Sequence, residues 1–220
     1  MENLKILNKL PDAYAAFLTE SVLEKSQIIE FKEASEIFMT DLPSNFCFLL
    51  SGKVLLVYED SNGFRLPLRM VDSNTTIIGG YSYFLKERSR HNLHYLVLEE
   101  CELLKLSSEK SASLLKDIDF FNYYARDLTD TSFSLIEEFV YRLGKNVETF
   151  LAYLIYKYSE DGELKVKNWS LFTKFVKASR STFYDSLKSL IDQGAIEKTE
   201  DRIIIKDLEV LKTLAEVEES

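Results

Sequence analysis

Residues 168–194 of this 220-residue chain read NWSLFTKFVKASRSTFYDSLKSLIDQG and predict two short helices joined by a tight turn. Asn168 and Ser179 stand where the helices would begin, and their side-chain oxygens can accept hydrogen bonds from the unpaired amides of a first turn. Gly194 stands where the second helix would end, because glycine adopts the left-handed conformation of a helix terminus with little strain. The segment therefore predicts a helix-turn-helix, although purely structural helical hairpins share this pattern.

The predicted second helix has two unlike faces. Phe183, Leu187, Leu190 and Ile191 recur at helical spacing and predict a buried face. Long polar side chains occupy the opposite face, and donors at the N-terminal end of such a helix can reach base edges in the major groove of DNA. The residues predicted to contact DNA are Ser179, Arg180, Ser181, Thr182, Tyr184, Asp185, Lys188 and, further along the chain, Arg202.

Each of these side chains predicts a kind of contact. Arg180 suits a guanine edge or a phosphate, and Asp185 can accept a hydrogen bond from cytosine or pair with Arg180 or Lys188. The short runs 195–199 and 203–205 flank a charged segment and predict a two-stranded wing that has Arg202 at its tip.

The charge of the chain is unevenly distributed. A net charge of −9 by itself disfavours nucleic acid as a partner. Residues 164–206, however, contain nine basic and five acidic residues, which gives a local charge of +4. This asymmetry favours a module that contacts phosphates, and ordinary solvated lysines remain the alternative interpretation.

The N-terminal part of the chain predicts a β-structure after a short amphipathic helix in residues 1–20. Asn62-Gly63 predicts a hairpin because both residues tolerate positive φ, and Ser51-Gly52 predicts a break between two strands. Many short strands at this spacing are typical of a sandwich or a barrel-like roll. The predicted strands are residues 28–31, 36–39, 46–50, 54–58, 66–71, 76–78, 93–98 and 103–106.

An apolar stripe at helical spacing follows, and it predicts one long helix or a helix with a break near residues 116–119. Such a stripe needs a partner, either the same helix of a second copy or the β-structure of its own chain. A further helix is predicted at 147–158. The stripe consists of Leu114, Ile118, Phe121, Ala125, Leu128, Leu135, Phe139 and Leu143.

Three segments resemble the Crp/Fnr family of transcription regulators. Residues 46–54 look like the strand, glycine turn and strand element of the family's β-roll. Residues 76–84 resemble the start of its phosphate-binding cassette, and residues 178–182 with Leu187, Lys188 and Leu190 are similar to its recognition helix.

The resemblance implies an α+β fold with an N-terminal, jelly-roll-like β-roll, a long dimerisation helix and a C-terminal winged helix-turn-helix. The corresponding domains are residues 1–107 as the effector or sensor domain, 108–145 as the dimerisation helix and hinge, and 146–220 as the DNA-binding domain. The implied protein is a cytoplasmic homodimer that binds double-stranded DNA at an inverted repeat. Its further implied partners are RNA polymerase and a small-molecule effector of unknown identity. No membrane partner is implied.

The chain departs from the family's pattern in the effector cassette and in the reading helix. Gly80 replaces the glutamate that binds the ribose of cyclic AMP, and the phosphate grip has only an imperfect counterpart, so cyclic AMP is not the expected effector. Lys177 replaces a turn glycine, and Asp185 replaces a second base-reading arginine. The candidate effector pocket consists of Gly79, Gly80, Tyr81, Arg88, Ser89 and Arg90.

The sequence predicts no cofactor, no metal and no enzymatic activity. Cys47 and Cys101 lie in apolar segments and predict buried thiols in a reduced setting, and the N-terminal cysteine cluster of the family's oxygen sensors has no counterpart. His91 and His94 fit ordinary polar roles better than haem or metal ligation. No nucleophile–base, paired-carboxylate or phosphate-loop motif is present. The alternative function is an effector-binding or protein-interaction module whose winged helix no longer binds DNA.

Overall fold

The computed structural model describes residues 12–42, 45–72, 92–166 and 168–217. The chain divides into two compact units, Met1–Thr131 and Ser132–Ser220. The strand predicted at 76–78 lies outside the described residues. No helix of the described part of the chain is both long enough and apolar enough to cross a membrane.

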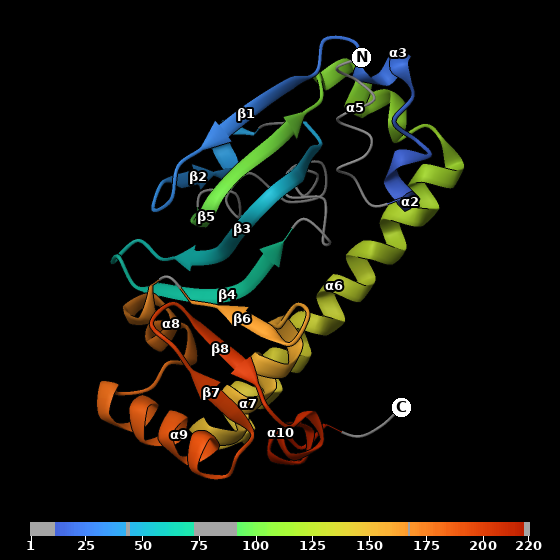
Figure 1. The fold of residues 1–220 in the computed structure, drawn as a ribbon. Coiled ribbons are helices and arrows are strands. Elements are labelled where there is room, and N and C mark those ends of the chain that lie inside the picture. The colour runs from blue at the N-terminus through green and yellow to red at the C-terminus, as the bar shows by residue number, and fades with distance from the viewer. Residues whose placement is uncertain (1–11, 43–44, 73–91, 167, 218–220) are drawn as a thin grey trace. The chain divides into compact units, whose positions relative to one another are not determined.

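An antiparallel sheet with the order β1-β5-β3-β4 forms the centre of the first unit, and β2 pairs with another part of β5 (Figure 1). This agrees with the predicted β-roll. The strands and the short 3-10 helix of this unit are β1 (Gln27–Phe31), β2 (Glu36–Phe38), η1 (Met39–Asp41), β3 (Cys47–Glu59), β4 (Arg65–Asp72) and β5 (Leu93–Lys105). The amphipathic N-terminus forms only α2 (Asp12–Ala15) and α3 (Glu20–Leu23) within the described residues.

The predicted break at Ser51-Gly52 is wrong, because β3 continues through it. The pairing of β3 with β5 shifts register several times between Leu49 and Val54, as at a β-bulge. Gly52 has φ +85, and a Cβ at this position would lie 2.4 Å from the carbonyl oxygen of Glu100. Glycine is therefore required by a close approach within the sheet, and the predicted runs 46–50 and 54–58 belong to one strand, as do 93–98 and 103–106.

The hairpin predicted at Asn62-Gly63 is confirmed, with a different backbone. Only Gly63 has a positive φ, at +78. Asp60 organises the turn, since its Oδ1 accepts hydrogen bonds from the amides of Asn62 at 2.8 Å and of Phe64 at 2.9 Å. The turn is thus held by an aspartate, and glycine is needed at one position rather than two.

Alternation along β3 builds two cores on opposite faces of the sheet. Phe46 and Phe48 belong to a cluster with helical residues, whereas Cys47 and Leu49 belong to a cluster of strand residues. The prediction of buried thiols is confirmed. Burial raises the pKa of Cys47 to about 12 and that of Cys101 to about 11, so both thiols stay protonated at neutral pH.

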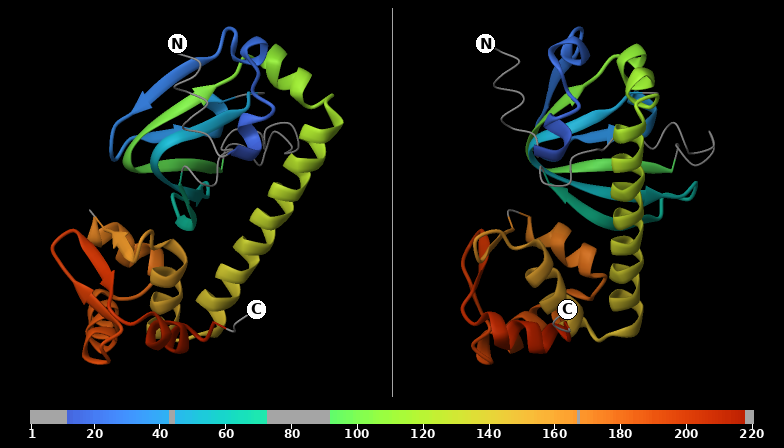
Figure 2. Two further views of the ribbon diagram at one scale, coloured as in Figure 1. Left: turned by 45° about the vertical axis from the view of Figure 1, so that its right-hand side comes forward. Right: turned by 90° about the vertical axis from the view of Figure 1, so that its right-hand side faces the viewer.

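The long helix is broken where the sequence predicted, between α5 (Ser108–Leu114) and α6 (Ile118–Gly144). Figure 2 shows α6 as one unbroken helix. The predicted stripe is only partly right, because its members do not share one environment. Leu114 is buried and Leu128 is half-buried against the helical core, whereas Leu143 is 76% exposed. In this unit α6 instead buries Phe120 and Tyr124, which lie on another face of the helix.

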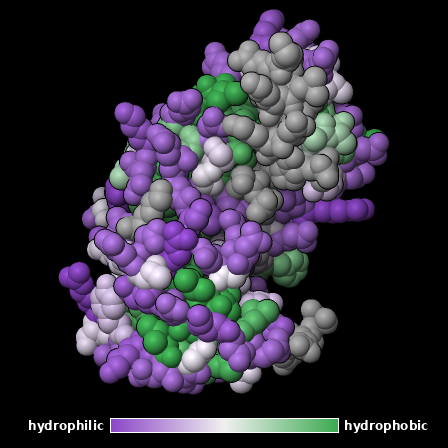
Figure 3. Space-filling view, in the orientation of Figure 1, coloured by the Kyte–Doolittle hydropathy of each residue, from purple (hydrophilic) through white to green (hydrophobic). Residues whose placement is uncertain are grey.

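The second unit contains the predicted helix-turn-helix and a larger sheet than expected. Its elements are α7 (Val147–Tyr158), β6 (Glu163–Lys165), α8 (Trp169–Val176), α9 (Arg180–Asp192), β7 (Ile196–Lys198), β8 (Arg202–Ile205) and α10 (Leu208–Ala215). The sheet order is β6-β8-β7, so the predicted two-stranded wing gains a third strand. Helix α7 packs against α9 and α10. In Figure 3 the apolar surface of this unit gathers over the small sheet.

Candidate nucleic-acid interface

Helix α8 is the first helix of the helix-turn-helix, and its sequence explains both of its ends. Oδ1 of Asn168 accepts a hydrogen bond from the amide of Leu171 at 3.0 Å, which confirms the predicted cap. Its apolar side chains Phe172, Phe175 and Val176 are buried. The helix ends at Lys177, whose φ of 57 and ψ of 38 are left-handed.

Helix α9 begins at the predicted cap. Oγ of Ser179 accepts a hydrogen bond from the amide of Thr182 at 3.1 Å. Phe183, Leu187 and Leu190 are buried in the core. Ile191 was predicted on this face but is 37% exposed, because one further residue rotates a helical side chain by about 100°. Gly194 has φ +74, as expected for the residue that ends the helix.

Trp169 connects α8, α9 and the wing, a role that the sequence did not predict. Its ring lies 6.5 Å from the rings of both Phe172 and Phe183. Its Nε1 donates to the carbonyl oxygen of Glu200 at 2.7 Å, and Lys198 Nζ lies 4.3 Å from its ring centroid. The only tryptophan of the chain was the available signal, and here it fixes the wing to the helix pair.

The outer face of α9 displays the predicted contact residues to solvent. Arg180 and Lys188 are exposed and form no hydrogen bond or ion pair with any residue that the structure describes. Tyr184 is exposed, with its ring packed edge-on against Phe183 at 5.2 Å between centroids. The remaining exposed members of this outer face are Ser179, Ser181, Thr182 and Asp185.

Asp185 does not pair with either neighbouring cation. Its Oδ2 accepts a hydrogen bond from Ser181 Oγ at 3.3 Å, and no ion pair joins it to Arg180 or Lys188 in the described part of the chain.

Arg202 differs from the residues on α9. It lies on β8, where its guanidinium bonds Glu163 at 2.8 Å and Asp201 at 3.1 Å. Asp201 and then Glu163 raise the pKa of Arg202 above its ordinary value. The structure therefore does not bring Arg202 to the outer face of α9, and its charge is already compensated within the wing.

Fewer cations of this unit are available to a partner than the nine basic residues of 164–206 suggested. Arg202 and Lys206 pair with carboxylates, and Lys198 lies over a tryptophan ring. Among the described residues from 164 to 206, six cations have no ion pair, namely Lys165, Lys174, Lys177, Arg180, Lys188 and Lys198.

A buried charge network ties the end of α6 to α7 within the second unit. Glu138 is buried, and its Oε1 lies 3.0 Å from Lys157 Nζ and also accepts a hydrogen bond from the Tyr158 hydroxyl. Tyr153 donates to Glu137 at 2.6 Å. Because α7 packs directly on α9, this network sets the position of the helix-turn-helix core relative to the end of α6.

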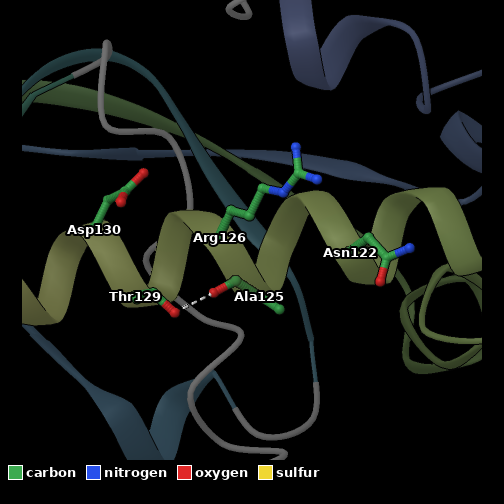
Figure 4. Close-up of a pocket in the computed structure, with 5 residues that line it drawn as sticks. All are labelled: Asn122, Ala125, Arg126, Thr129 and Asp130. Atoms are coloured by element: carbon green, nitrogen blue, oxygen red, sulfur yellow. Dashed lines mark hydrogen bonds between the residues drawn. The ribbon is translucent and has the colours of Figure 1, made fainter.

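The candidate effector pocket of Gly79, Gly80, Tyr81, Arg88, Ser89 and Arg90 lies outside the described residues, as does His91. His94 is buried against the ring of Phe38. A hollow of ≈ 540 Å³ lies beside α6, and those of its lining residues that the structure describes come from this helix (Figure 4). They are Asn122, Ala125, Arg126, Thr129 and Asp130.

No protein-family model and no curated protein matches this chain. Solved structures do match it. One from Eubacterium rectale, described as a transcriptional regulator of the Crp/Fnr family, is 14% identical with a TM-score of 0.69, over 95% of this chain and 99% of that one. A Crp/Fnr-family regulator from Thermus thermophilus is 21% identical with a TM-score of 0.63, over 86% and 98% of the two chains.

A second regulator from Thermus thermophilus, of the Crp family, is 15% identical with a TM-score of 0.67, over 86% of this chain and 96% of that one. The chain therefore has the fold of the Crp/Fnr transcriptional regulators, as the resemblance implied. At these identities the similarity establishes the fold, and the activity has to be argued from the residues.

Proposed function

We propose that this chain is a sequence-specific DNA-binding transcription regulator that binds an inverted-repeat site as a homodimer. The observation that carries the proposal is the outer face of α9. On it Arg180 and Lys188 are exposed and bond to none of the described residues, while the opposite face of the same helix is fixed in the core by Phe183, Leu187 and Leu190. A rigid helix with uncommitted donors suits insertion into the major groove.

Each exposed residue of α9 has a distinct role in this proposal. Arg180, in the first turn, donates two hydrogen bonds to a guanine edge, and Asp185 accepts one from the amino group of cytosine. Lys188 lies further along the helix and binds a phosphate as a point charge. Arg202 contributes only where a phosphate displaces Glu163 and Asp201.

The dimer in this proposal forms through α6. Exposed apolar side chains lie along it, and from Phe133 to Leu143 they recur at steps of three and four residues, which suits pairing with an identical helix. Large apolar side chains that remain in water at this spacing indicate a surface that another protein covers. The most exposed members are Ile118, Phe121, Phe133, Ile136, Val140 and Leu143.

A two-fold dimer presents two copies of α9 to DNA about one helical turn apart, ~34 Å, so the site is an inverted repeat. The hollow beside α6 includes Ala125 and Thr129, which continue the four-residue spacing between Phe121 and Phe133.

The proposed regulator acts in the cytoplasm, has no enzymatic activity and is not controlled by cyclic AMP. RNA polymerase and a small-molecule effector are its proposed further partners.

Selection of bound sequences from a random DNA pool tests the proposal. The wild type should enrich a palindrome, and Arg180→Ala should lose the preference at one base pair in each half-site, at a cost of about 1–3 kcal/mol. Lys32→Ala is the matched control, because it removes an exposed cation from the loop between β1 and β2. Failure of the wild type to enrich any palindrome contradicts the proposal, as does an unchanged preference in Arg180→Ala.

A second function is favoured by two observations. Arg202 is neutralised by carboxylates, and Asp185 places a negative charge on the reading face. Both features suit an effector-binding or protein-interaction module that has lost DNA affinity. DNA binding that weakens steeply with salt supports the regulator, whereas the absence of any salt-dependent binding supports this alternative.

A further inference from the structure

Arg69 of β4 lies on an otherwise apolar face of the sheet in the first unit. It is opposite Leu56 of β3, and two residues further along the pair Val71 is opposite Val54. Residues directly opposite each other in an antiparallel pair share one face of the sheet. The buried cluster of strand residues contains Leu56, Val54 and Val71. Arg69 is therefore on the face of the sheet that covers this core.

The guanidinium of Arg69 is incompletely satisfied. Its Nε and Nη1 atoms are buried and have no hydrogen-bond partner within the described ranges. Arg65, on the same strand, shows the contrast, since it is half exposed and bonds Glu36 at 2.7 Å and Glu59 at 2.8 Å. Buried donors without acceptors are costly, and this cost rises when the donor is charged.

The nearby opposite charge does not meet this need. Burial raises the pKa of Asp127 on α6, and the nearby charge of Arg69 only partly offsets this rise. No hydrogen bond or ion pair joins the two side chains in the residues that the structure describes. Asp127 is therefore close enough to influence Arg69 and too distant to satisfy its donors.

We propose that Arg69 is the receptor for a small anion, whose carboxylate or phosphate oxygens accept the hydrogen bonds of its buried Nε and Nη1 atoms. Guanidinium groups bind both of these oxyanions through charge-assisted hydrogen bonds. Arg69 lies outside the cassette segment in which the sequence predicted the effector pocket. Asp127 opposes the ligand, because a second negative charge near the same guanidinium competes for it.

If the chain is the proposed regulator, the anion is its effector. Only this role as an effector rests on the proposed function, and binding of the anion does not. Binding itself is measured on the full chain without DNA. Its failure would leave the proposal of DNA binding intact, and failure of DNA binding would leave the anion site intact.

Thermal unfolding in sodium chloride, sodium benzoate or sodium phosphate at equal ionic strength tests the site. Benzoate supplies a carboxylate and inorganic phosphate supplies a phosphate, so the two arms identify the anion. One of them should raise the unfolding midpoint of the wild type by about 2–4 °C relative to chloride. The same anion should leave Arg69→Leu unmoved, and the shift should grow in Asp127→Asn.

Arg65→Leu is the matched control, because it removes an exposed arginine from the same strand and should keep the full shift. In chloride alone, Arg69→Leu should unfold at the same or a higher temperature than the wild type, since it removes a buried cation that lacks partners. The proposal is overturned if neither anion moves the wild type, or if both anions move the wild type and Arg69→Leu equally. A lower midpoint for Arg69→Leu in all three salts also overturns it, because the guanidinium would then be structural.

Discussion

Helices α6 and α9 both leave one face uncovered, and the chemistry of the two faces is opposite. Along α6 the uncovered side chains include Phe133, Ile136 and Val140, which are more than half exposed. Along α9 they include Arg180 and Lys188, while Phe183, Leu187 and Leu190 on its opposite face are buried. Helix α6 thus leaves an apolar surface uncovered, whereas α9 leaves a cationic one uncovered.

The difference indicates which partner each helix takes. Apolar surface gains free energy from burial against any complementary apolar surface, and that gain is largely insensitive to salt. Exposed cations gain free energy from a polyanion through counterion release, which salt weakens steeply. We therefore expect self-association through α6 to persist at salt concentrations that abolish DNA binding through α9.

The largest expected effect comes from placing charge on the uncovered face of α6. Ile136→Asp combined with Val140→Asp should convert the dimer to a monomer and weaken binding to a palindromic site by about 100-fold or more, because the two half-sites are no longer bound as one unit. Light scattering and a DNA titration measure the two effects. Lys116→Asp adds the same carboxylate outside this stripe and should change neither. A double variant that remains dimeric at low micromolar concentration would show that α6 is not the interface.

These positions replace Leu128 and Leu135, which the sequence alone would have selected. Both are half-buried in the structure, and Leu128 packs against the core of its own unit. An aspartate at either position would destabilise the monomer as well as the dimer, so the result could not be assigned to the interface.

Arg180→Lys separates geometry from charge on α9. Lysine keeps the positive charge but lacks the planar pair of donors, so we expect a loss of about 1–2 kcal/mol at one base pair and an unchanged salt dependence. Binding to the selected palindrome and to single-base variants of it provides the measurement. Equal loss on every sequence would mean that Arg180 contacts phosphate instead of a base.

Lys188→Ala should have a smaller effect that is uniform across sequences. Removal of one phosphate contact lowers the slope of log affinity against log salt by about 1 per protomer, without a change in base preference. Titrations at several salt concentrations measure this slope, with Lys32→Ala as the comparison. A sequence-dependent loss would instead place Lys188 against a base edge.

Asp185→Ala should have the smallest effect on affinity. Its carboxylate repels phosphates but accepts a hydrogen bond from one base, so the two contributions oppose each other. Selection from a random pool should show a changed base at one position, with overall affinity within about threefold of the wild type. An increase in affinity on all sequences alike would show that Asp185 only repels DNA.

The sequence predicted the helix-turn-helix well because its signals are local. Asn168, Ser179 and Gly194 each mark a helix end by their own chemistry, and the structure places all three as expected. Helix α7 is likewise predicted over the same residues that the structure shows. Such signals require knowledge only of the neighbouring residues.

The errors arise where distant residues decide. Gly52 resembles a turn glycine in the sequence, but Glu100, on another strand, is what requires it. The exposed face of α6 could not be distinguished from its buried face, because Phe120 and Tyr124 pack on Phe46, which is far away in the chain. The unsatisfied guanidinium of Arg69 gave no sequence signal, since its environment comes from β3 and α6.

Folding stability and the proposed DNA binding make opposite demands on the left-handed turn at Lys177. A lysine at φ 57 is strained by about 1 kcal/mol, and glycine would adopt this conformation without that strain. Lys177→Gly should therefore raise the unfolding midpoint by about 1–3 °C. It should also remove an exposed cation two residues before the cap of the reading helix and weaken DNA binding. Stability alone would thus favour glycine at this turn, whereas the proposed DNA binding favours a cation.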